Sequence, residues 1–270
     1  MSAPTSSESR LDRRLAGRIA DGRRLLVPYL TAGFPGRDDT VPLLHALVRG
    51  GADVIELGVP FSDPLADGPT IQGSSQRSLE GGGSLRTTLD ALREFRKDDP
   101  ATPVVLFTYL NPVFRHGLDA FLEDAEAAGA DGVLLTDLPL GEDPGLEARL
   151  EESPLALVRL VAPTTPPDRA RRIAGRAQGF LYYISRTGVT GARADVRMEL
   201  EAEVRELAAA ASVPVVVGFG ISSAEQAATV GGMADGVVVG SALIEAIREG
   251  GVARAEAFVA ELRGGLDGLG

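Results

Sequence analysis

The 270-residue chain is 44% hydrophobic, which provides enough material for one large core. Its formal charge of −11 argues against non-specific binding to nucleic acids or anionic membranes, although a nest of backbone N–H groups can still hold a phosphate on an acidic protein. The absence of cysteine excludes disulfides, thiolate nucleophiles and Cys-ligated metals, and the two distant histidines, His45 and His116, exclude a multi-histidine metal site.

The N-terminal segment is polar, and we expect a flexible tail over 1–9 followed by an extra first helix. This segment lacks the apolar core of a secretory signal, and the chain has no run of about 18 apolar residues. We therefore expect no membrane span and a cytoplasmic location. At the other end, residues 264–270 are expected to form a second flexible tail.

Short runs rich in β-branched residues recur along the chain, each followed by a polar or Gly/Pro-rich turn. Most are almost continuously apolar, which is typical of parallel strands buried on both faces. The expected strands are Leu25–Thr31, Val54–Val59, Val104–Tyr109, Gly132–Thr136, Ala156–Ala162, Phe180–Ser185, Val213–Gly218 and Gly236–Val239.

Amphipathic stretches lie between these runs, with apolar residues spaced three and four apart. The expected helices are Asp39–Arg49, Ser84–Lys97, Leu118–Ala127, Leu146–Glu151, Asp168–Ala177, Met198–Ala209, Ala224–Val230 and Val252–Leu262. Strand–helix alternation predicts a parallel sheet, and this many repeats favour closure over an open doubly wound sheet. We therefore predict an α/β protein, a single (β/α)8 TIM barrel over 1–270, a fold that typically needs about 250 residues.

The active site of such a barrel lies at the carboxyl ends of its strands, and the second expected strand carries a carboxylate there. Glu56 lies within an apolar run, where a charge is costly unless it is paired or used. One interpretation is a general acid or base whose pKa is raised by apolar walls. The other is a structural glutamate satisfied by backbone N–H groups or an arginine, and the residues alone leave both open. The loop that follows holds Asp63 and Asp67 among prolines and glycines, which by itself favours a turn.

Glycine-rich segments follow the last two strands, and the second of them leads into a helix at Ser241. In barrels this pair of exits commonly binds phosphate, because glycine lets the backbone approach the anion. The alternative is that both are only tight turns. A third such segment, Ser185–Asp195, is interpreted as a mobile lid or a plain loop. We expect it and the loop Phe61–Thr70 to be mobile without ligand. Several of the few aromatic residues also fall at strand exits, which would permit an apolar pocket for a flat substrate.

These motifs resemble the tryptophan synthase α-subunit family over nearly the whole chain, from about Leu25 to Leu262. The most specific stretch is ELGVPFSDPLADGPTIQ, from Glu56 to Gln72. The segments LVPYLTAGFP, TYLNPVF, TDLP, YYISRTGVTG, VGFGIS and VVGSALI agree in the same order. The resemblance implies a lyase of tryptophan biosynthesis, an aromatic amino acid pathway, that cleaves indole-3-glycerol phosphate to indole and glyceraldehyde 3-phosphate by a retro-aldol reaction.

The resemblance also implies a role for individual residues. Glu56 and Asp67 match the two catalytic residues, the second of which interacts with the indole N–H, and Thr190 matches a lid residue that bonds Asp67 when the lid is closed. The implied phosphate-binding residues are Gly191, Gly220, Gly240 and Ser241. The implied indole-pocket residues are Tyr29, Phe107, Leu134, Thr136, Tyr182 and Phe219, with Val161 as a further match.

The inventory of reactive residues agrees with this chemistry. Aldol-type cleavage usually uses a Schiff-base lysine or a zinc ion. The one lysine, Lys97, lies in a charged helical stretch and metal ligands are too few, which leaves acid–base chemistry. Our hypothesis is that Glu56 protonates indole C3 and helps remove the proton of the side-chain hydroxyl, while Asp67 stabilises positive charge at the indole nitrogen.

The family further implies a partner, a tryptophan synthase β subunit in an αββα heterotetramer, with Asp63 and Asn111 facing it. The β subunit would carry pyridoxal phosphate and receive indole directly, and no cofactor is expected in this chain. Three alternatives stay open. They are a free-standing indole-releasing lyase, another phosphosugar barrel enzyme such as an isomerase or an indole-glycerol-phosphate synthase (whose catalytic lysines these strands lack), and a non-catalytic phosphate-binding activator of a partner.

Overall fold

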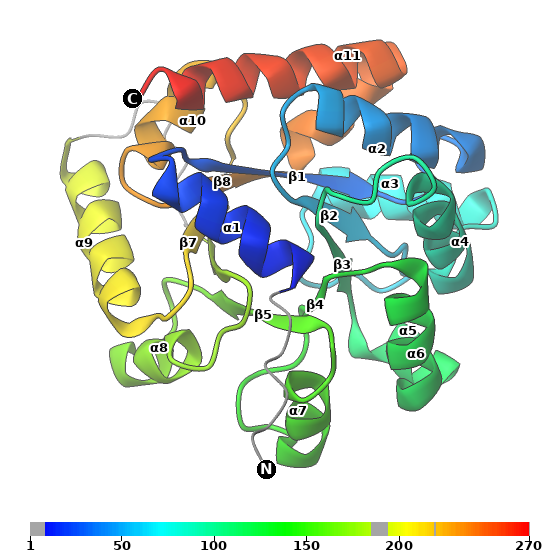
Figure 1. Ribbon diagram of the computed structural model, residues 1–270, viewed down its shortest axis with the longest axis horizontal. Helices are drawn as coiled ribbons and strands as arrows, with labels where there is room; N and C mark the ends of the chain where they lie inside the picture. Colours follow the sequence, from blue (N-terminus) through cyan, green and yellow to red (C-terminus); the bar gives the residue numbers. More distant parts are fainter. Residues whose placement is uncertain (1–8, 185–193, 219, 270) are drawn as a thin grey trace.

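Eight parallel strands close into a barrel in the order β1 to β8, as Figure 1 shows for the computed structural model. The structure describes residues 9–184, 194–218 and 220–269. The predicted (β/α)8 barrel is thus confirmed, and each observed strand lies within the range expected for it. The strands are β1 (Leu25–Thr31), β2 (Ile55–Gly58), β3 (Val104–Thr108), β4 (Gly132–Leu135), β5 (Ala156–Val161), β6 (Leu181–Ile184), β7 (Val215–Gly218) and β8 (Gly236–Val239).

Helices surround this barrel on its outside (Figure 1). They are α1 (Arg10–Ala20), the 3₁₀ turn η1 (Arg37–Asp39), α2 (Thr40–Arg49), α3 (Pro69–Glu80), α4 (Leu85–Phe95), α5 (Leu110–His116), α6 (Leu118–Ala128), α7 (Pro144–Glu151), α8 (Pro167–Ala174), α9 (Ala194–Ala210), α10 (Ala224–Gly231) and α11 (Ser241–Asp267). None of the helices in the described ranges is long and apolar enough to cross a membrane.

Alternation along each strand divides the core into two parts. On β2, Ile55 and Leu57 belong to the large cluster between the sheet and the helices, whereas Val54, just before the strand, belongs to the cluster inside the barrel. Successive strand residues point to opposite faces, so Glu56 shares the inner face with Val54. This alternation is why a glutamate in an apolar strand faces the barrel interior.

The extra N-terminal helix α1 is confirmed, and it lies across the end of the barrel at which the strands begin (Figure 1). Its apolar residues Leu11 and Leu15 are buried in the interior cluster. Ser9 caps the helix by accepting a hydrogen bond from the backbone N–H of Asp12. Because α1 closes this end, the opposite end is the one open to a substrate.

The same end of the barrel carries a clamp that repeats four times. Just before each even-numbered strand, a side chain accepts a hydrogen bond of 2.8–2.9 Å from a backbone N–H of the preceding odd-numbered strand. The backbone N–H of that same residue donates back to the carbonyl of the same partner, at 2.8–3.3 Å. The four pairs are Asp53 with Leu26, Asp131 with Val104, Gln178 with Leu157 and Asp235 with Val215. The clamp satisfies backbone groups that the ladder leaves unpaired at the strand starts.

Two helices were not predicted from the sequence. In α3 the buried positions are Ser74, Ser75 and Ser78, so no apolar stripe marks the helix. Their hydroxyls make specific contacts instead. The Ser78 hydroxyl, for example, donates a hydrogen bond to the carbonyl of Ala32 (2.6 Å). Helix α5 has only Val113 buried and is too short for a periodic pattern to stand out.

The C-terminal helix is longer than expected. Helix α11 begins at Ser241, passes a kink at Gly250 and Gly251, and continues to Asp267. Leu266 is buried in the core, and Asp267 pairs with Arg23 and with Arg263. Residues 264–267 are therefore helical, and the expectation of a tail over 264–270 was wrong for them.

Candidate active site

A cavity of about 420 Å³ lies at the carboxyl ends of the strands and collects most of the residues singled out from the sequence. This volume falls within the range of about 300–1,000 Å³ that is usual for small-molecule sites. Its lining residues are Tyr29, Glu56, Ala66, Asp67, Gly68, Ile71, Phe107, Thr136, Leu160, Tyr182, Ile184, Gly218, Gly220, Ile221, Val238, Gly240, Ser241 and Ala242.

Glu56 is the buried acid of this cavity. Its side chain comes from the inner face of β2, beside Tyr29 of β1 and Val105 of β3 in the ladder register. The residue is 1% exposed, and its Oε1 has no hydrogen-bond partner among the described residues. Burial raises the pKa of Glu56 to about 8, because low-dielectric surroundings disfavour the charged form. The structure thus offers a neutral carboxylic acid that projects into an apolar cavity at pH 7. The alternative of a glutamate satisfied by backbone N–H groups or an arginine is not what these contacts show.

Asp67 is the second acid, and the loop after β2 carries it to the cavity. The hydroxyl of Tyr109 donates a hydrogen bond to Asp67 Oδ2 (3.1 Å) and accepts one from the backbone N–H of Ala66 (3.1 Å). Gln72 Nε2 donates to the Asp67 carbonyl at 2.9 Å, which ties the loop to α3. Burial raises the pKa of Asp67 to about 6, although the Tyr109 hydrogen bond opposes this shift. Asp67 is therefore mostly ionised at pH 7, in contrast to Glu56.

Two tyrosines form walls of the cavity, and each packs over a glycine on the neighbouring strand. Tyr29 on β1 lies over Gly58 on β2, and Tyr182 on β6 lies over Gly218 on β7, so that a Cβ at either glycine would overlap the tyrosine hydroxyl. Tyr29 also meets Phe107 edge-to-face, with ring centroids 5.2 Å apart. Burial raises the pKa of both tyrosines above the usual value, so both remain neutral and form a largely apolar wall.

The start of α11 forms another part of the cavity wall, next to Tyr29. Gly240 is the N-cap residue and has no side-chain cap, and Ser241 is the first helical residue. Gly220 has a φ of 38°, a left-handed value that favours glycine. Free N–H groups at the first turn of a helix, together with the helix dipole, favour an anion such as phosphate. This position supplies positive potential on an otherwise acidic chain.

The remaining predicted residues fall into three groups. Thr190, Gly191 and Phe219 lie outside the described residues, as does most of the expected lid Ser185–Asp195. Leu134 is buried in the interior cluster and is not among the residues that line the cavity. Asp63 and Asn111 are exposed.

The match of Val161 to the pocket was wrong. Val161 lies on the outer face of β5 in the cluster under the helices, and the cavity is lined by its neighbour Leu160 instead. Strand alternation could have found Leu160, because Leu160 shares a face with Val158. Ile71 and Ile221 were also missed. Ile71 lies on the unpredicted helix α3, and an isolated apolar residue in a loop such as Ile221 carries no sequence signal.

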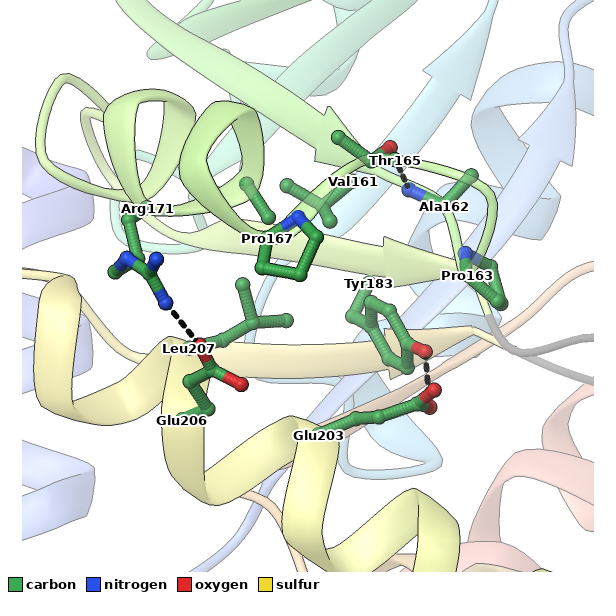
Figure 2. A pocket seen from close by; sticks show the side chains of 11 residues that line it. Val161, Ala162, Pro163, Thr165, Pro167, Arg171, Tyr183, Glu203, Glu206 and Leu207 are labelled. Atoms are coloured by element: carbon green, nitrogen blue, oxygen red, sulfur yellow. Dashed lines mark hydrogen bonds and ion pairs between the residues drawn. The ribbon is translucent and has the colours of Figure 1, made fainter.

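A smaller pocket of about 160 Å³ lies outside the barrel, between α8 and α9. Figure 2 shows that the Tyr183 hydroxyl donates a hydrogen bond to Glu203 there and that Arg171 forms an ion pair with Glu206. The Thr165 hydroxyl accepts a hydrogen bond from the backbone N–H of Ala162. Val161 lines this pocket, but none of the other predicted site residues that the structure describes does. Tyr183 is the neighbour of Tyr182 on β6 and points to the other face of the sheet, so this pocket is separate from the 420 Å³ cavity.

Comparisons with known proteins agree with the geometry. Residues 15–264 match the family model described as "Tryptophan synthase alpha chain". The chain is 52% identical over 264 residues to the tryptophan synthase alpha chain of Xanthomonas oryzae pv. oryzae (strain MAFF 311018), covering 96% of this chain and 98% of the relative.

Solved structures give the same result. The tryptophan synthase subunit alpha from Legionella pneumophila str. Paris is similar, with a TM-score of 0.90 and 40% identity over 97% of this chain and 100% of that one. A tryptophan synthase from Mycobacterium tuberculosis (space group F222) is similar, with a TM-score of 0.86 and 40% identity over 96% of this chain and 99% of that one. The chain therefore belongs to the tryptophan synthase alpha chain family.

Proposed function

We infer that this chain is a lyase that cleaves indole-3-glycerol phosphate to indole and glyceraldehyde 3-phosphate, in tryptophan biosynthesis. The observation that carries this inference is the pair of cavity acids with divergent environments. Glu56 has a pKa of about 8 and Asp67 has one of about 6, so at pH 7 the first is an acid and the second an anion. Titratable groups whose environments push their pKa values apart are typical of assigned acid and base roles.

The reaction follows from these two charge states. Neutral Glu56 donates its proton to C3 of the indole ring, which places positive charge on the ring nitrogen. Asp67, ionised, stabilises this charge through the indole N–H. Ionised Glu56 then takes the proton of the adjacent side-chain hydroxyl, the carbon–carbon bond breaks, and its electron pair restores the aromatic ring. The products are indole and an aldehyde, with no net gain or loss of atoms. Each positioned acid or base typically contributes about 10²- to 10⁴-fold to such a rate.

The phosphate of the substrate is proposed to bind at the start of α11. Gly240 and Ser241 line the cavity together with Gly220 of the preceding exit. The backbone N–H groups and the Ser241 hydroxyl are the donors there. Gly191 is proposed as a further phosphate-binding residue and Thr190 as the lid residue on the strength of the family resemblance. Tyr29, Phe107, Thr136, Tyr182 and Phe219 are proposed to enclose the indole ring, with Leu134 packed behind them.

We further propose that the chain works with a tryptophan synthase β subunit in an αββα assembly, and that the surface around Asp63 and Asn111 faces that partner. Both residues are exposed, and Asp63 lies in the loop that carries Asp67. The partner would hold pyridoxal phosphate, while this chain needs only the carboxylates described above. A contact on this loop would couple partner binding to the position of Asp67.

Indole release from indole-3-glycerol phosphate tests the proposal, first with the purified chain alone and then with a tryptophan synthase β subunit added. Slow release alone and strong acceleration by the β subunit are expected. Equally fast release without the β subunit would favour a free-standing lyase. No release in either case would contradict the proposed reaction.

A further inference from the structure

A second, side pocket opens beside the catalytic cavity and shares part of its wall. It has a volume of about 270 Å³, and Ala66, Thr136, Leu160 and Ile184 line both spaces. From this shared rim it extends between the segments that follow β4 and β5, as far as Ile173 of α8. Whole-ligand sites usually measure about 300–1,000 Å³, so the side pocket is the size of a part of a ligand rather than of a separate substrate.

The lining of the side pocket indicates what it can hold. Leu138, Leu140 and Ile173 make it largely apolar. Arg159 also lines it and is 4% exposed, and its Nε has no hydrogen-bond partner among the described residues. Arg159 forms ion pairs through its Nη2 with Glu147 Oε2 (2.8 Å) and Glu151 Oε1 (2.7 Å), and these carboxylates balance its charge. Arg169 lines the pocket as well, and it donates a hydrogen bond to the Leu140 carbonyl (3.0 Å). A largely apolar space edged by arginine donors suits a neutral group that carries an acceptor atom.

We propose that this side pocket is a specificity subsite of the lyase, which admits neutral substituents on the benzo ring of the indole. The inference rests on the proposed function. The main cavity holds the indole and the phosphate, and a bulky ring substituent crosses the shared rim into the side pocket. Residues around that pocket, Leu138 above all, then set how large a substituent is accepted. They do so without touching the reacting atoms.

The reverse reaction provides a direct assay. In it, C3 of a free indole bonds to the aldehyde carbon of glyceraldehyde 3-phosphate, the C3 proton leaves, and the carbonyl oxygen gains a proton. The four benzyloxyindoles that carry the group on the benzo ring are suitable probes, since benzyloxy is neutral, bulky and has one ether oxygen. The purified full chain is assayed with indole and with each isomer. We expect at least one isomer to reach kcat/KM within about tenfold of that for indole.

Leu138→Phe and Leu138→Ala change the size of the side pocket. Leu207→Phe is the matched control, because it adds the same ring to the pocket of Figure 2 and Leu207 does not line the side pocket. Leu138→Phe is expected to lower kcat/KM for the accepted isomer by about tenfold or more, while the value for indole stays within about twofold. Leu138→Ala is expected to raise the ratio of kcat/KM for the accepted isomer to kcat/KM for indole. Leu207→Phe is expected to leave this ratio unchanged.

Failure of the inference and failure of the proposed function give different results. If the wild-type chain condenses indole but every benzyloxy isomer is slower by more than about tenfold, the side pocket is not a subsite. The same holds if Leu138→Phe lowers kcat/KM equally for indole and for the accepted isomer. It also holds if Leu138→Ala leaves the ratio of the two kcat/KM values unchanged, and this second variant keeps the proposal testable should Leu138→Phe not fold. If the wild-type chain does not condense indole itself, the proposed function is wrong and the inference falls with it.

Discussion

The hydroxyl of Tyr109 donates a hydrogen bond to Asp67 Oδ2 at 3.1 Å and thereby connects the end of β3 to the loop after β2. Tyr109 is itself 4% exposed, and its ring packs against Phe61 with centroids 5.1 Å apart. The loop that carries the second acid is therefore held by a side chain from the neighbouring strand. The position and the ionisation of Asp67 both depend on this contact.

Tyr109→Phe is expected to raise the pKa of Asp67 above its value of about 6, because the lost hydrogen bond favoured the charged form. The acidic limb of the kcat/KM profile for indole release would move to higher pH by about one unit, which corresponds to about 1.4 kcal/mol. The measurement is a pH–rate profile of the wild type and the variant. Tyr183→Phe is the control, because it removes a hydroxyl outside the catalytic cavity. An unshifted acidic limb would show that Tyr109 does not tune Asp67.

Gly218→Ala is expected to narrow the catalytic cavity. A Cβ at position 218 would overlap the hydroxyl of Tyr182, so the ring must move into the space proposed for the indole. Overpacking of this kind typically costs about 1–3 kcal/mol, and substrate affinity should fall as well. KM for indole-3-glycerol phosphate and the free energy of unfolding measure the two effects. Gly264→Ala, a helical site where a Cβ meets nothing within 4 Å, should instead be stabilising. Unchanged KM in Gly218→Ala would contradict the placement of Tyr182 in the substrate wall.

Asp235 tests the repeated clamp at the strand starts. Asp235→Ala leaves the backbone N–H of Val215 without its 2.8 Å acceptor and is expected to cost about 1–3 kcal/mol of unfolding free energy. Asp235→Asn keeps an acceptor oxygen, and Gln178 already fills the equivalent place in the third clamp with an amide. The asparagine variant should therefore lose much less. Equal losses in urea unfolding would mean that the charge of Asp235, rather than its hydrogen bond, stabilises the barrel.

Glu56 should make the ligand-free protein less stable as the pH rises. Its folded pKa of about 8 lies above the value of 4.5 for an exposed glutamate. A raised pKa contributes stability that is fully present below pH 4.5 and is lost as the pH rises towards 8. The total loss is on the order of 5 kcal/mol. Glu56→Gln stays neutral at every pH. At pH 4.5 its unfolding free energy should be close to that of the wild type, whereas at pH 8.5 the variant should be the more stable protein. A difference independent of pH would show that the buried carboxyl is not held neutral.

The strands and the unusual position of Glu56 could be predicted from the sequence because both leave a direct mark in it, whereas Asp67 was singled out only by the family resemblance. Apolar runs identify buried parallel strands, and an acid such as Glu56 within one of them stands out. Helix α3 could not be predicted, because its buried face consists of serines that satisfy local hydrogen bonds rather than of an apolar stripe.

The cavity wall was predicted less completely than its acids. Aromatic residues at strand exits were identified, but Leu160 and Ile221 are aliphatic residues like those of the core, and only the closed barrel distinguishes the residues that line the cavity. The side pocket depends on how the segments after β4 and β5 pack against α8, which no local pattern encodes. The fourfold clamp was missed for the same reason, since it pairs residues 20–27 positions apart through tertiary contact.

Indole release by wild type and Glu56→Gln, measured side by side with folding checked by circular dichroism, tests the central claim most directly. The variant keeps the size of the side chain but can neither donate nor accept the proton. The account predicts a loss in kcat of at least about 10²-fold with the barrel intact. Turnover close to that of the wild type would contradict the assignment of Glu56 as the acid and base of the reaction.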